Sequence, residues 1–309
     1  MKKKVFKSLD EQIEILKEKD LIINDVDKAK EILLRENYFF ISGYRHLLMT
    51  KNEKTFVPGS TFDELHSIFK FDRHIRNILF KYILIIENNI KSVISYNLSK
   101  KYGHREKEYL NPKNFTKNII KTRQVADVLN KIKRQIRING RKHTATTHYL
   151  ANYDYIPLWI LVKVLSFGIV SEFYNIFLDD DKISVASYYN VDKEELGIYL
   201  SILSNMRNLC AHEEVLYDHR TQKEIENTRF HRNLNIEKYE GMYLYGKNDL
   251  FAVVIILKQL LDKCDFIDFI NEIEYEISIL DGKLSSVEIE PLLNKIGFPS
   301  NWMQIKEEV

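Results

Sequence analysis

The segment Arg207-Asn208-Leu209-Cys210-Ala211-His212 carries the side chains best suited to chemistry in this chain. Cleavage of RNA through its 2′-hydroxyl needs a base for the hydroxyl proton, an acid for the leaving 5′-oxygen and a cation for the phosphorane charge. Histidine titrates near neutral pH, and arginine keeps its charge while offering planar donors to phosphate oxygens. Arg207 and His212 can therefore serve as catalytic residues without a metal. Asn208 either supports them, by holding the imidazole or a phosphate oxygen, or is an ordinary surface asparagine.

The helix that must carry this segment is predicted to begin at Asp192. At about 3.6 residues per turn, Arg207 lines up with Leu200 and Leu203 on the apolar stripe. A guanidinium on that face must pair with an acid or line a polar cleft, because burying it unpaired is costly. His212 lies roughly 140° further round the helix. The two side chains therefore converge only where the helix end or a partner helix shapes a shared pocket, and their spacing alone is weak evidence for catalysis.

A second feature is the charge of residues 113–143, where ten Lys or Arg residues stand against the single acid Asp127. The net charge of this segment is +9, whereas the whole chain carries only +2, and residues 248–309 hold five basic and twelve acidic residues. Such a density of positive charge favours contact with nucleic-acid phosphates. The alternative is a solvated helix face, or one that docks on the acidic carboxyl-terminal part. The candidate RNA-binding residues are Lys131, Lys133, Arg134, Arg137, Arg141 and Lys142.

The elements that position these residues are predicted to be helical throughout. Only 10 Gly and 5 Pro interrupt a chain with 45% hydrophobic residues, which favours an all-α fold. Thr61 and Glu64 form a capping box that opens a periodic segment reaching about Lys100, a scaffold helix near ten turns long. Asp72, Arg76 and Glu87 lie on or beside its apolar stripe. Internal salt bridges explain them better than catalysis, although their roles stay open.

The remaining helices are predicted from capping boxes and apolar spacing. One helix is predicted to begin at Ser8, a second to cover about 25–36, and a third to lie in the apolar segment from 157 to 174. Two more are predicted through 253–261 and near 287–296, and residues 218–246 are predicted to form a loop or irregular insertion. The aromatic residues of 38–44 are expected to be buried. We divide the chain into an amino-terminal helical region (1–60), a helical core (61–217) and a carboxyl-terminal part packed on it (218–309).

Composition also narrows the location and the chemistry. No stretch approaches the length of uncharged apolar residues that a membrane span needs, and the basic amino end lacks the apolar centre of a signal peptide. Cys210 and Cys264 have no CxxC or Cys/His cluster around them, so neither a disulfide framework nor a zinc site is indicated. We expect a cytoplasmic protein without a cofactor or a metal site.

Several segments together resemble the Abi-like proteins, the AbiD and AbiF group of bacterial abortive-infection factors, which contain a HEPN ribonuclease motif. The resemblance spans nearly the whole chain. The matching segments are Asp10-Glu11-Gln12, Asn37-Tyr38 to Ser42-Gly43-Tyr44, Phe71-Asp72-Arg73-His74-Ile75-Arg76, Ile86-Glu87, Pro157-Leu158-Trp159, Phe167-Gly168, Met206 to His212, and Gly297-Phe298-Pro299-Ser300-Asn301-Trp302.

This resemblance implies a HEPN-type helical bundle with amino- and carboxyl-terminal helical extensions and a role as a phage-defence toxin. It carries Arg207 and His212 over as catalytic residues, with Asn208 at the position that follows the arginine. It also implies a homodimer, because the related type VI CRISPR nucleases have two such motifs and this chain has one. The AbiF branch is associated with a structured non-coding RNA, for which residues 113–143 are the candidate contact.

Three hypotheses follow. The first is a metal-independent endoribonuclease that leaves 2′,3′-cyclic phosphate ends. The second is an RNA-binding or sensor module in which the motif grips RNA without cutting it. The third is a purely structural helical protein, in which Arg207 pairs with Asp72 or Glu87 and His212 merely ends a helix. No DNA or membrane partner is expected.

Overall fold

The computed structural model describes residues 5–52 and 54–307, and the elements are almost all helices. The α-helices are α1 (Leu9–Lys17), α2 (Val26–Glu36), α3 (Tyr38–Ser42), α4 (Phe62–Tyr102), α5 (Glu106–Tyr109), α6 (Thr122–Asn139), α7 (Thr144–Tyr153), α8 (Leu158–Leu161), α9 (Phe167–Asn175), α10 (Asp179–Ala186), α11 (Lys193–Ala211), α12 (Arg229–Asn233), α13 (Leu250–Leu260), α14 (Lys263–Asp281) and α15 (Glu290–Ile296). Short 3₁₀ turns are η1 (Arg45–Leu47), η2 (Pro112–Asn114), η3 (Ile119–Lys121), η4 (Val162–Val164), η5 (Ser187–Tyr189) and η6 (Trp302–Lys306). Strands β1 (Lys238–Tyr239) and β2 (Met242–Tyr243) form a small antiparallel pair within the predicted insertion. The predicted all-α class is confirmed.

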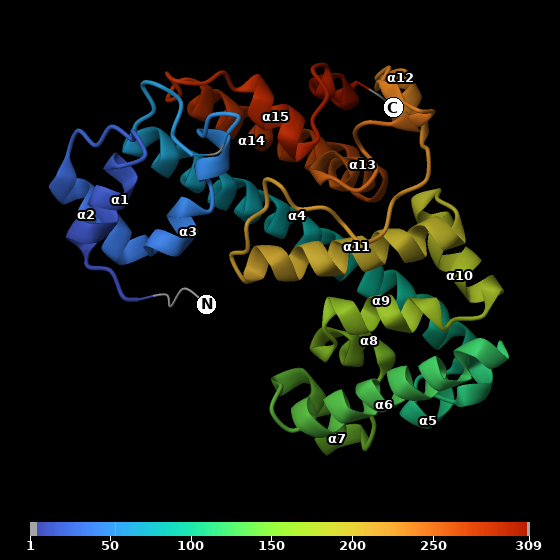
Figure 1. The fold of residues 1–309 in the computed structure, drawn as a ribbon. Helices are drawn as coiled ribbons and strands as arrows, with labels where there is room; N and C mark the ends of the chain where they lie inside the picture. Colours follow the sequence, from blue (N-terminus) through green and yellow to red (C-terminus); the bar gives the residue numbers. More distant parts are fainter. Residues whose placement is uncertain (1–4, 53, 308–309) are drawn as a thin grey trace.

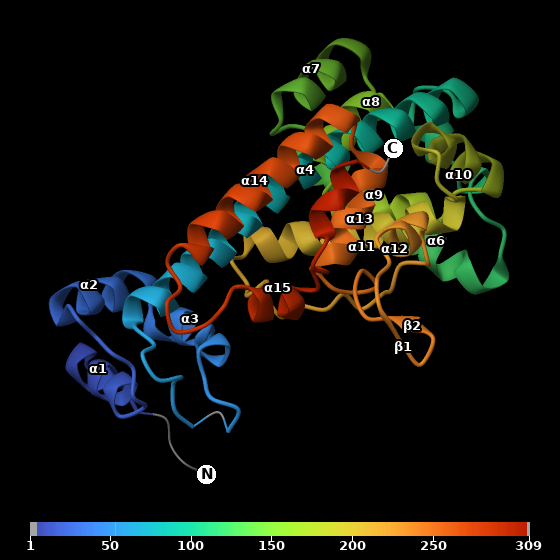
Figure 2. The same ribbon diagram turned by 90° about the horizontal axis from the view of Figure 1, so that it is seen from above.

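Helix α4 is the axis of the fold, and its 41 residues confirm the predicted scaffold helix. Thr61 and Glu64 form the expected capping box at its start, and Gly103, with φ +94°, ends it in a conformation that favours glycine. Helices α14 and α11 make its most extensive contacts, and α8 and α10 also pack on it. Figures 1 and 2 show α14 running alongside α4 while α11 crosses it.

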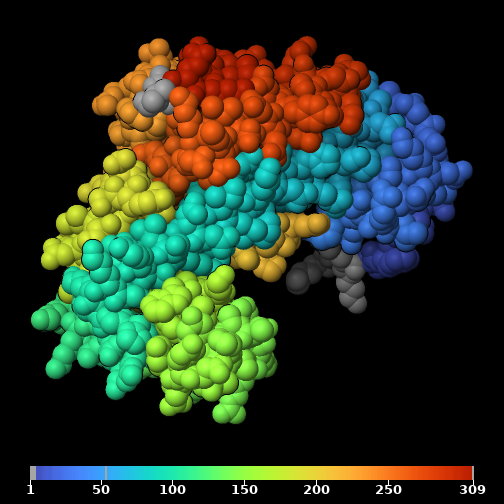
Figure 3. All heavy atoms as spheres, turned by 180° about the vertical axis from the view of Figure 1, so that it is seen from behind, coloured from blue at the N-terminus to red at the C-terminus, as the bar shows by residue number. Residues whose placement is uncertain are grey.

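The helices leave an open notch on one face of the molecule. Helices α1–α3 lie at one end of α4, and α5–α8 lie toward the other end. In the space-filling view of Figure 3, the gold end of α11 is visible between these two regions, with open space beside it. The end of α11 therefore lies at a concave surface. Among the described residues, no helix is both long and apolar enough to span a membrane.

Two predictions, for segments 157–174 and 38–44, need correction. The apolar segment 157–174 is not one helix: α8 passes into a 3₁₀ turn, Leu165 is extended (φ −85°, ψ 132°), and Ser166 caps the separate helix α9 by accepting the Ile169 N–H. The aromatic cluster at 38–44 is only partly buried. Tyr44 is 1% exposed, but Phe39 and Phe40 are 72% and 49% exposed on the short helix α3.

Helix α14 was missed from the sequence, where its acidic residues obscured the apolar spacing. Its buried side chains are Phe266, Phe269, Ile270, Ile273 and Leu280, which follow a helical period. Its acids pair with α4: Lys81 donates to Glu272 at 2.6 Å, and the His74 ring lies 2.7 Å from Glu276. Two of the twelve acids in 248–309 therefore help to hold α14 on α4.

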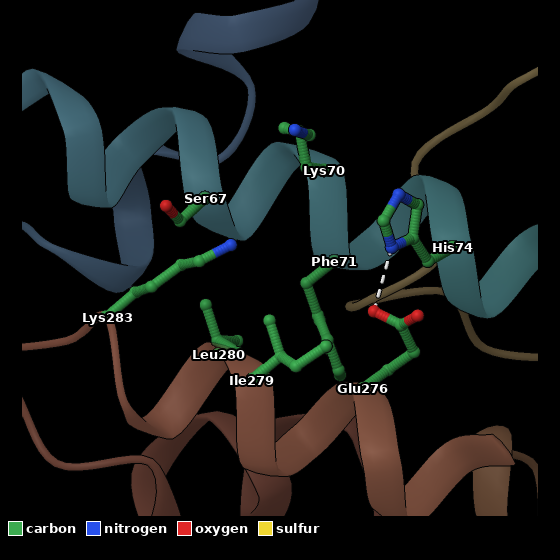
Figure 4. A pocket seen from close by; sticks show the side chains of 8 residues that line it. All are labelled: Ser67, Lys70, Phe71, His74, Glu276, Ile279, Leu280 and Lys283. Atoms are coloured by element: carbon green, nitrogen blue, oxygen red, sulfur yellow. Dashed lines mark hydrogen bonds and ion pairs between the residues drawn. The ribbon is translucent and has the colours of Figure 1, made fainter.

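The gap beside the His74–Glu276 contact is too small to be a substrate site. Figure 4 shows its lining from both helices, with Ser67 and Lys70 on α4 and Lys283 just beyond α14. Its volume is about 20 Å³, which is room for roughly one water molecule. We interpret it as a packing gap.

Glu64 ties the carboxyl-terminal part of the chain to the start of α4. Its carboxylate accepts the N–H groups of Ser285 and Ser286, each at 2.7 Å, as well as that of Thr61. Burial alone would raise the pKa of Glu64, but these backbone donors outweigh burial and lower the pKa to about 2. Because the folded-state pKa lies below the unfolded value, the stabilisation is present above about pH 4.5 and is lost as pH falls toward 2.

Glu64→Gln should therefore lower the free energy of unfolding near neutral pH, by up to about 3 kcal/mol. The difference from wild type should shrink as pH falls from about 4.5 to 2, as measured by urea denaturation at each pH. Glu31→Gln, at an exposed position of α2, is the matched control and should show no such trend. A difference for Glu64→Gln that stays constant over this range would contradict the assignment.

Candidate active site

The predicted start of the helix that carries the Arg207–His212 segment is confirmed. Asp192 accepts the Glu194 N–H at 2.7 Å and forms a capping box with Glu195. Helix α11 ends at Ala211, and His212 is its C-terminal cap. Glu213 then turns the chain with φ +54°, a left-handed conformation that directs the following residues back toward α4. The candidate segment thus forms the last turn of α11 and its cap.

Arg207 is held loosely against α4. Its side chain is 34% exposed, its guanidinium lies 5.3 Å from the centre of the Phe80 ring, and its Nε lies 3.6 Å from Oε2 of Glu87. That distance is too long for a hydrogen bond, and both atoms are buried without any hydrogen-bond partner. Among the described residues, Glu87 is the only charged partner of Arg207. The terminal nitrogens of the guanidinium are therefore available to an anionic ligand.

Glu87 is itself committed to a second cation. Lys91 donates to Oε1 of Glu87 at 2.6 Å, and the two side chains are 10% and 8% exposed. The internal salt bridges predicted for α4 are confirmed here and in the Asp72–Arg76 pair. Of the two partners predicted for Arg207 in the structural hypothesis, Asp72 is excluded by its pairing with Arg76, and Glu87 makes only the longer contact.

A buried network fixes the chain immediately after His212. Asp72 and Arg76, both 2% exposed, form an ion pair one turn apart on α4, and Tyr44 donates to Asp72 at 2.6 Å. Asp72 also accepts the Leu216 N–H at 3.2 Å, and Arg76 donates to the Glu214 carbonyl at 3.1 Å. Burial raises the pKa of Tyr44, so its hydroxyl stays protonated and remains a donor. This network holds the chain that follows α11 against α4.

His212 and Asn208 both face solvent. Neither side chain makes a hydrogen bond or ion pair within the described part of the chain, so His212 is not hydrogen-bonded to Arg207. Cys210, between them, is buried, and burial raises the pKa of its thiol to about 12. Cys210 is therefore a neutral packing residue near pH 7 rather than a nucleophile.

Most of the predicted RNA-binding residues are free, but one is not. Helix α6 buries Val125, Val128 and Ile132 and packs on α9 rather than on the acidic carboxyl-terminal helices. Lys131 donates to both oxygens of Glu172 on α9, at 2.7 and 2.6 Å, so its charge is largely neutralised. The other five predicted RNA-binding residues are exposed and have no ion pair with any residue of 54–307. They are Lys133, Arg134 and Arg137 on α6, and Arg141 and Lys142 in the turn before α7.

Sequence analysis missed three residues around the site. Phe80 lies under Arg207, and Tyr44 completes the buried network from a distant segment. Lys91 pairs with Glu87 one turn away, and its i, i+4 spacing was a signal that the sequence did contain. Phe80 and Tyr44 gave no such signal, because each meets its partner only through tertiary packing.

Comparison with known proteins adds one finding. A model of the Abi-like protein family matches residues 31–218, which include α4, the basic helix α6 and the whole Arg207–His212 segment. No curated protein matches the chain, and no solved structure matches it either.

Arg76 and Arg207 should respond differently to truncation. Arg76→Ala leaves Asp72 buried without its counter-ion and should lower the free energy of unfolding by about 3–5 kcal/mol. Arg207→Ala should cost less than about 1 kcal/mol, because Arg207 is partly exposed and Glu87 keeps Lys91 as a partner. Urea denaturation of both variants, with Arg232→Ala on the surface of α12 as control, measures the difference. Equal destabilisation by Arg207→Ala and Arg76→Ala would favour the structural role for Arg207.

Proposed function

This chain belongs to the Abi-like protein family, whose role is abortive infection in phage defence, and from this premise we propose that it is a metal-independent endoribonuclease. The observation that carries the proposal is the state of the Arg207–His212 segment. Arg207 is held at the surface with no hydrogen-bonded acid, and His212 is exposed without a partner five positions later. A structural pair of this kind would be expected to be closed and buried.

In the proposed reaction, a neutral His212 takes the proton of the RNA 2′-hydroxyl as that oxygen attacks the adjacent phosphorus. The bond from phosphorus to the 5′-oxygen breaks, a protonated imidazole returns a proton to that oxygen, and the products are a 2′,3′-cyclic phosphate and a 5′-hydroxyl. Arg207 donates to the non-bridging oxygens and stabilises the phosphorane charge. Asn208 supports them, and Glu87 is a positioning residue that orients the guanidinium from behind.

The proposed active site is shared between two copies of the chain. Each copy offers one arginine and one histidine that are not hydrogen-bonded to each other, whereas the reaction needs a base, an acid and a cation in one place. A homodimer with two facing α11 ends supplies all of these. The open notch in Figure 3 leaves room beside the end of α11, and the exposed Phe39 and Phe40 of α3 offer nearby apolar surface for a partner.

RNA contact is assigned to the five exposed cations of α6 and the following turn that have no ion pair, which are Lys133, Arg134, Arg137, Arg141 and Lys142. They form the free part of the basic segment and are suited to phosphate neutralisation. In our proposal this face holds RNA, including a structured non-coding RNA that controls the protein. The second candidate function, RNA binding or sensing without cleavage, is favoured by the same face, because it does not depend on the chemistry of Arg207 and His212.

Purified wild-type protein should cut labelled total RNA in the presence of EDTA, and the fragments should carry cyclic phosphate ends. Arg207→Ala and His212→Ala should each lose at least about 100-fold in rate, the scale of one acid–base or charge-stabilising group. Arg232→Ala, a surface arginine on α12, is the matched control and should cut normally. Gel analysis with end-group mapping measures both rate and product.

The outcomes separate the two candidates. Loss of cutting in both folded variants, with the control active, supports the nuclease. Wild-type protein that binds RNA but never cuts it, even after co-purified RNA has been stripped away, overturns the nuclease in favour of the binding module. Cutting that persists in His212→Ala would show that the nuclease uses another base.

The salt dependence of RNA binding should distinguish the free cations from the paired one. Replacing Arg134 and Arg137 by Gln should reduce the slope of log affinity against log salt by about 1.4, or about 0.7 for each lost phosphate contact on a single strand. Lys131→Gln should change it less, because Glu172 already neutralises that ammonium. Fluorescence anisotropy in the His212→Ala background, which prevents cleavage, gives the slopes. If Lys131→Gln reduced the slope as much as each of the Arg134 and Arg137 replacements does, this assignment of the α6 surface would be contradicted.

A further inference from the structure

A hollow between α4 and α8 lies beside the proposed active site. Its volume is about 580 Å³, within the range of roughly 300–1,000 Å³ that small-ligand sites occupy. Lys91 and Asn88 line it from α4, Trp159 from α8, Lys163 from the η4 turn, and His143 from the cap of α7. None of the lining residues, all within the described part of the chain, is acidic.

Four of the side chains that line this hollow are left without polar or stacking partners among the described residues. Trp159 is 44% exposed, and its ring stacks on no aromatic residue of 54–307, although Leu158 and Leu161 on the same helix are fully buried. Asn88, His143 and Lys163 are exposed, and their side chains make no hydrogen bond or ion pair to the described residues. An unstacked indole, two cationic or titratable groups and an amide thus surround one space.

The hollow also joins two regions that are far apart in the sequence. His143 directly follows Arg141 and Lys142, the last cations of the basic segment. On the opposite wall, Lys91 donates to Glu87 at 2.6 Å, and the other oxygen of Glu87 faces Nε of Arg207 at 3.6 Å. The hollow therefore borders the end of the basic segment through His143 and is linked to Arg207 through the Lys91–Glu87 pair.

We propose that this hollow is a binding subsite for one nucleotide of a single RNA strand, with the base stacked on Trp159 and its phosphate bound by Lys163 and His143. The subsite leads the strand from α6 toward Arg207, so it rests on the proposed function and deepens it. Base stacking on an aromatic side chain beside a phosphate-binding lysine is a common way to hold single-stranded RNA. Asn88 adds a donor and an acceptor for a base edge.

An acidic peptide is the competing ligand, because it would also meet the positive charge. The exposed indole favours the nucleotide, because a base has a flat aromatic face that can stack on the indole ring. A carboxylate side chain has no such face. Lys163, which has no ion pair among the described residues, can bind phosphate as a point charge. We therefore assign the subsite to RNA and use the peptide as a control ligand.

The test uses the full chain with His212→Ala, so that bound RNA is not cut. Trp302→Phe leaves Trp159 as the sole tryptophan of the chain, and a short oligoadenylate should then quench its fluorescence in a saturable manner. Independently, anisotropy with labelled oligoadenylate should show that Trp159→Ala weakens binding about 5- to 150-fold, while Trp159→Tyr retains most of the affinity. Tyr275→Ala, which removes an exposed ring from α14, is the matched control and should bind normally.

The outcomes distinguish the subsite from the nuclease. Unchanged affinity in Trp159→Ala overturns the subsite, and so does equal quenching by polyglutamate, whether or not the wild-type chain cuts RNA. If the wild-type chain does not cut RNA but Trp159→Ala still weakens RNA binding, the subsite is supported. In that case only the proposed nuclease activity is overturned. Slower cutting by Trp159→Ala that recovers at high RNA concentration supports both, because it places the loss in binding rather than in the chemical step.

Discussion

Asp72 and Arg76 lie one turn apart on α4, almost fully buried, and the position of the candidate site depends on their pairing. The pair stays stable in the interior because Tyr44, the Leu216 amide and the Glu214 carbonyl satisfy its remaining hydrogen-bonding groups. Those partners come from α3's flank and from the chain just after α11. A single ion pair on the central helix therefore joins the amino-terminal region to the segment that follows His212.

The next charged groups along α4 serve a different purpose. Glu87 binds Lys91 tightly and faces Arg207 across a longer gap, so it is a buried acid with one close cation and one loose one. Glu87 orients the Arg207 guanidinium without taking up its terminal N–H donors, so these donors can bind an anionic ligand. The contrast with Arg76 is one of degree of burial and hydrogen bonding, not of residue type.

Segregation of charge along the chain has two separate structural uses. Glu272 and Glu276 of α14 contact Lys81 and His74 of α4, so they help to hold the two helices together. Three cations of α6, Lys133, Arg134 and Arg137, are exposed and have no ion pair among the described residues, whereas Lys131 pairs with Glu172 and Arg123 lies 4.0 Å from Asp127. A net charge of only +2 for the chain hides this division, because opposite charges lie on different helices. The exposed basic surface is available to phosphates for that reason.

The sequence by itself determined the helical class, the long scaffold helix from its capping box, the helix start at Asp192, and the Arg207 and His212 pattern, because each is a local or periodic signal. It also indicated that charges on α4 would pair internally. Only the tertiary structure decided which acid each arginine meets, that Lys131 is neutralised by Glu172, that 157–174 breaks into two helices, and that Trp159 borders a hollow with Lys91. These outcomes depend on which helix faces which, and no local pattern encodes the distance between residues brought together by packing.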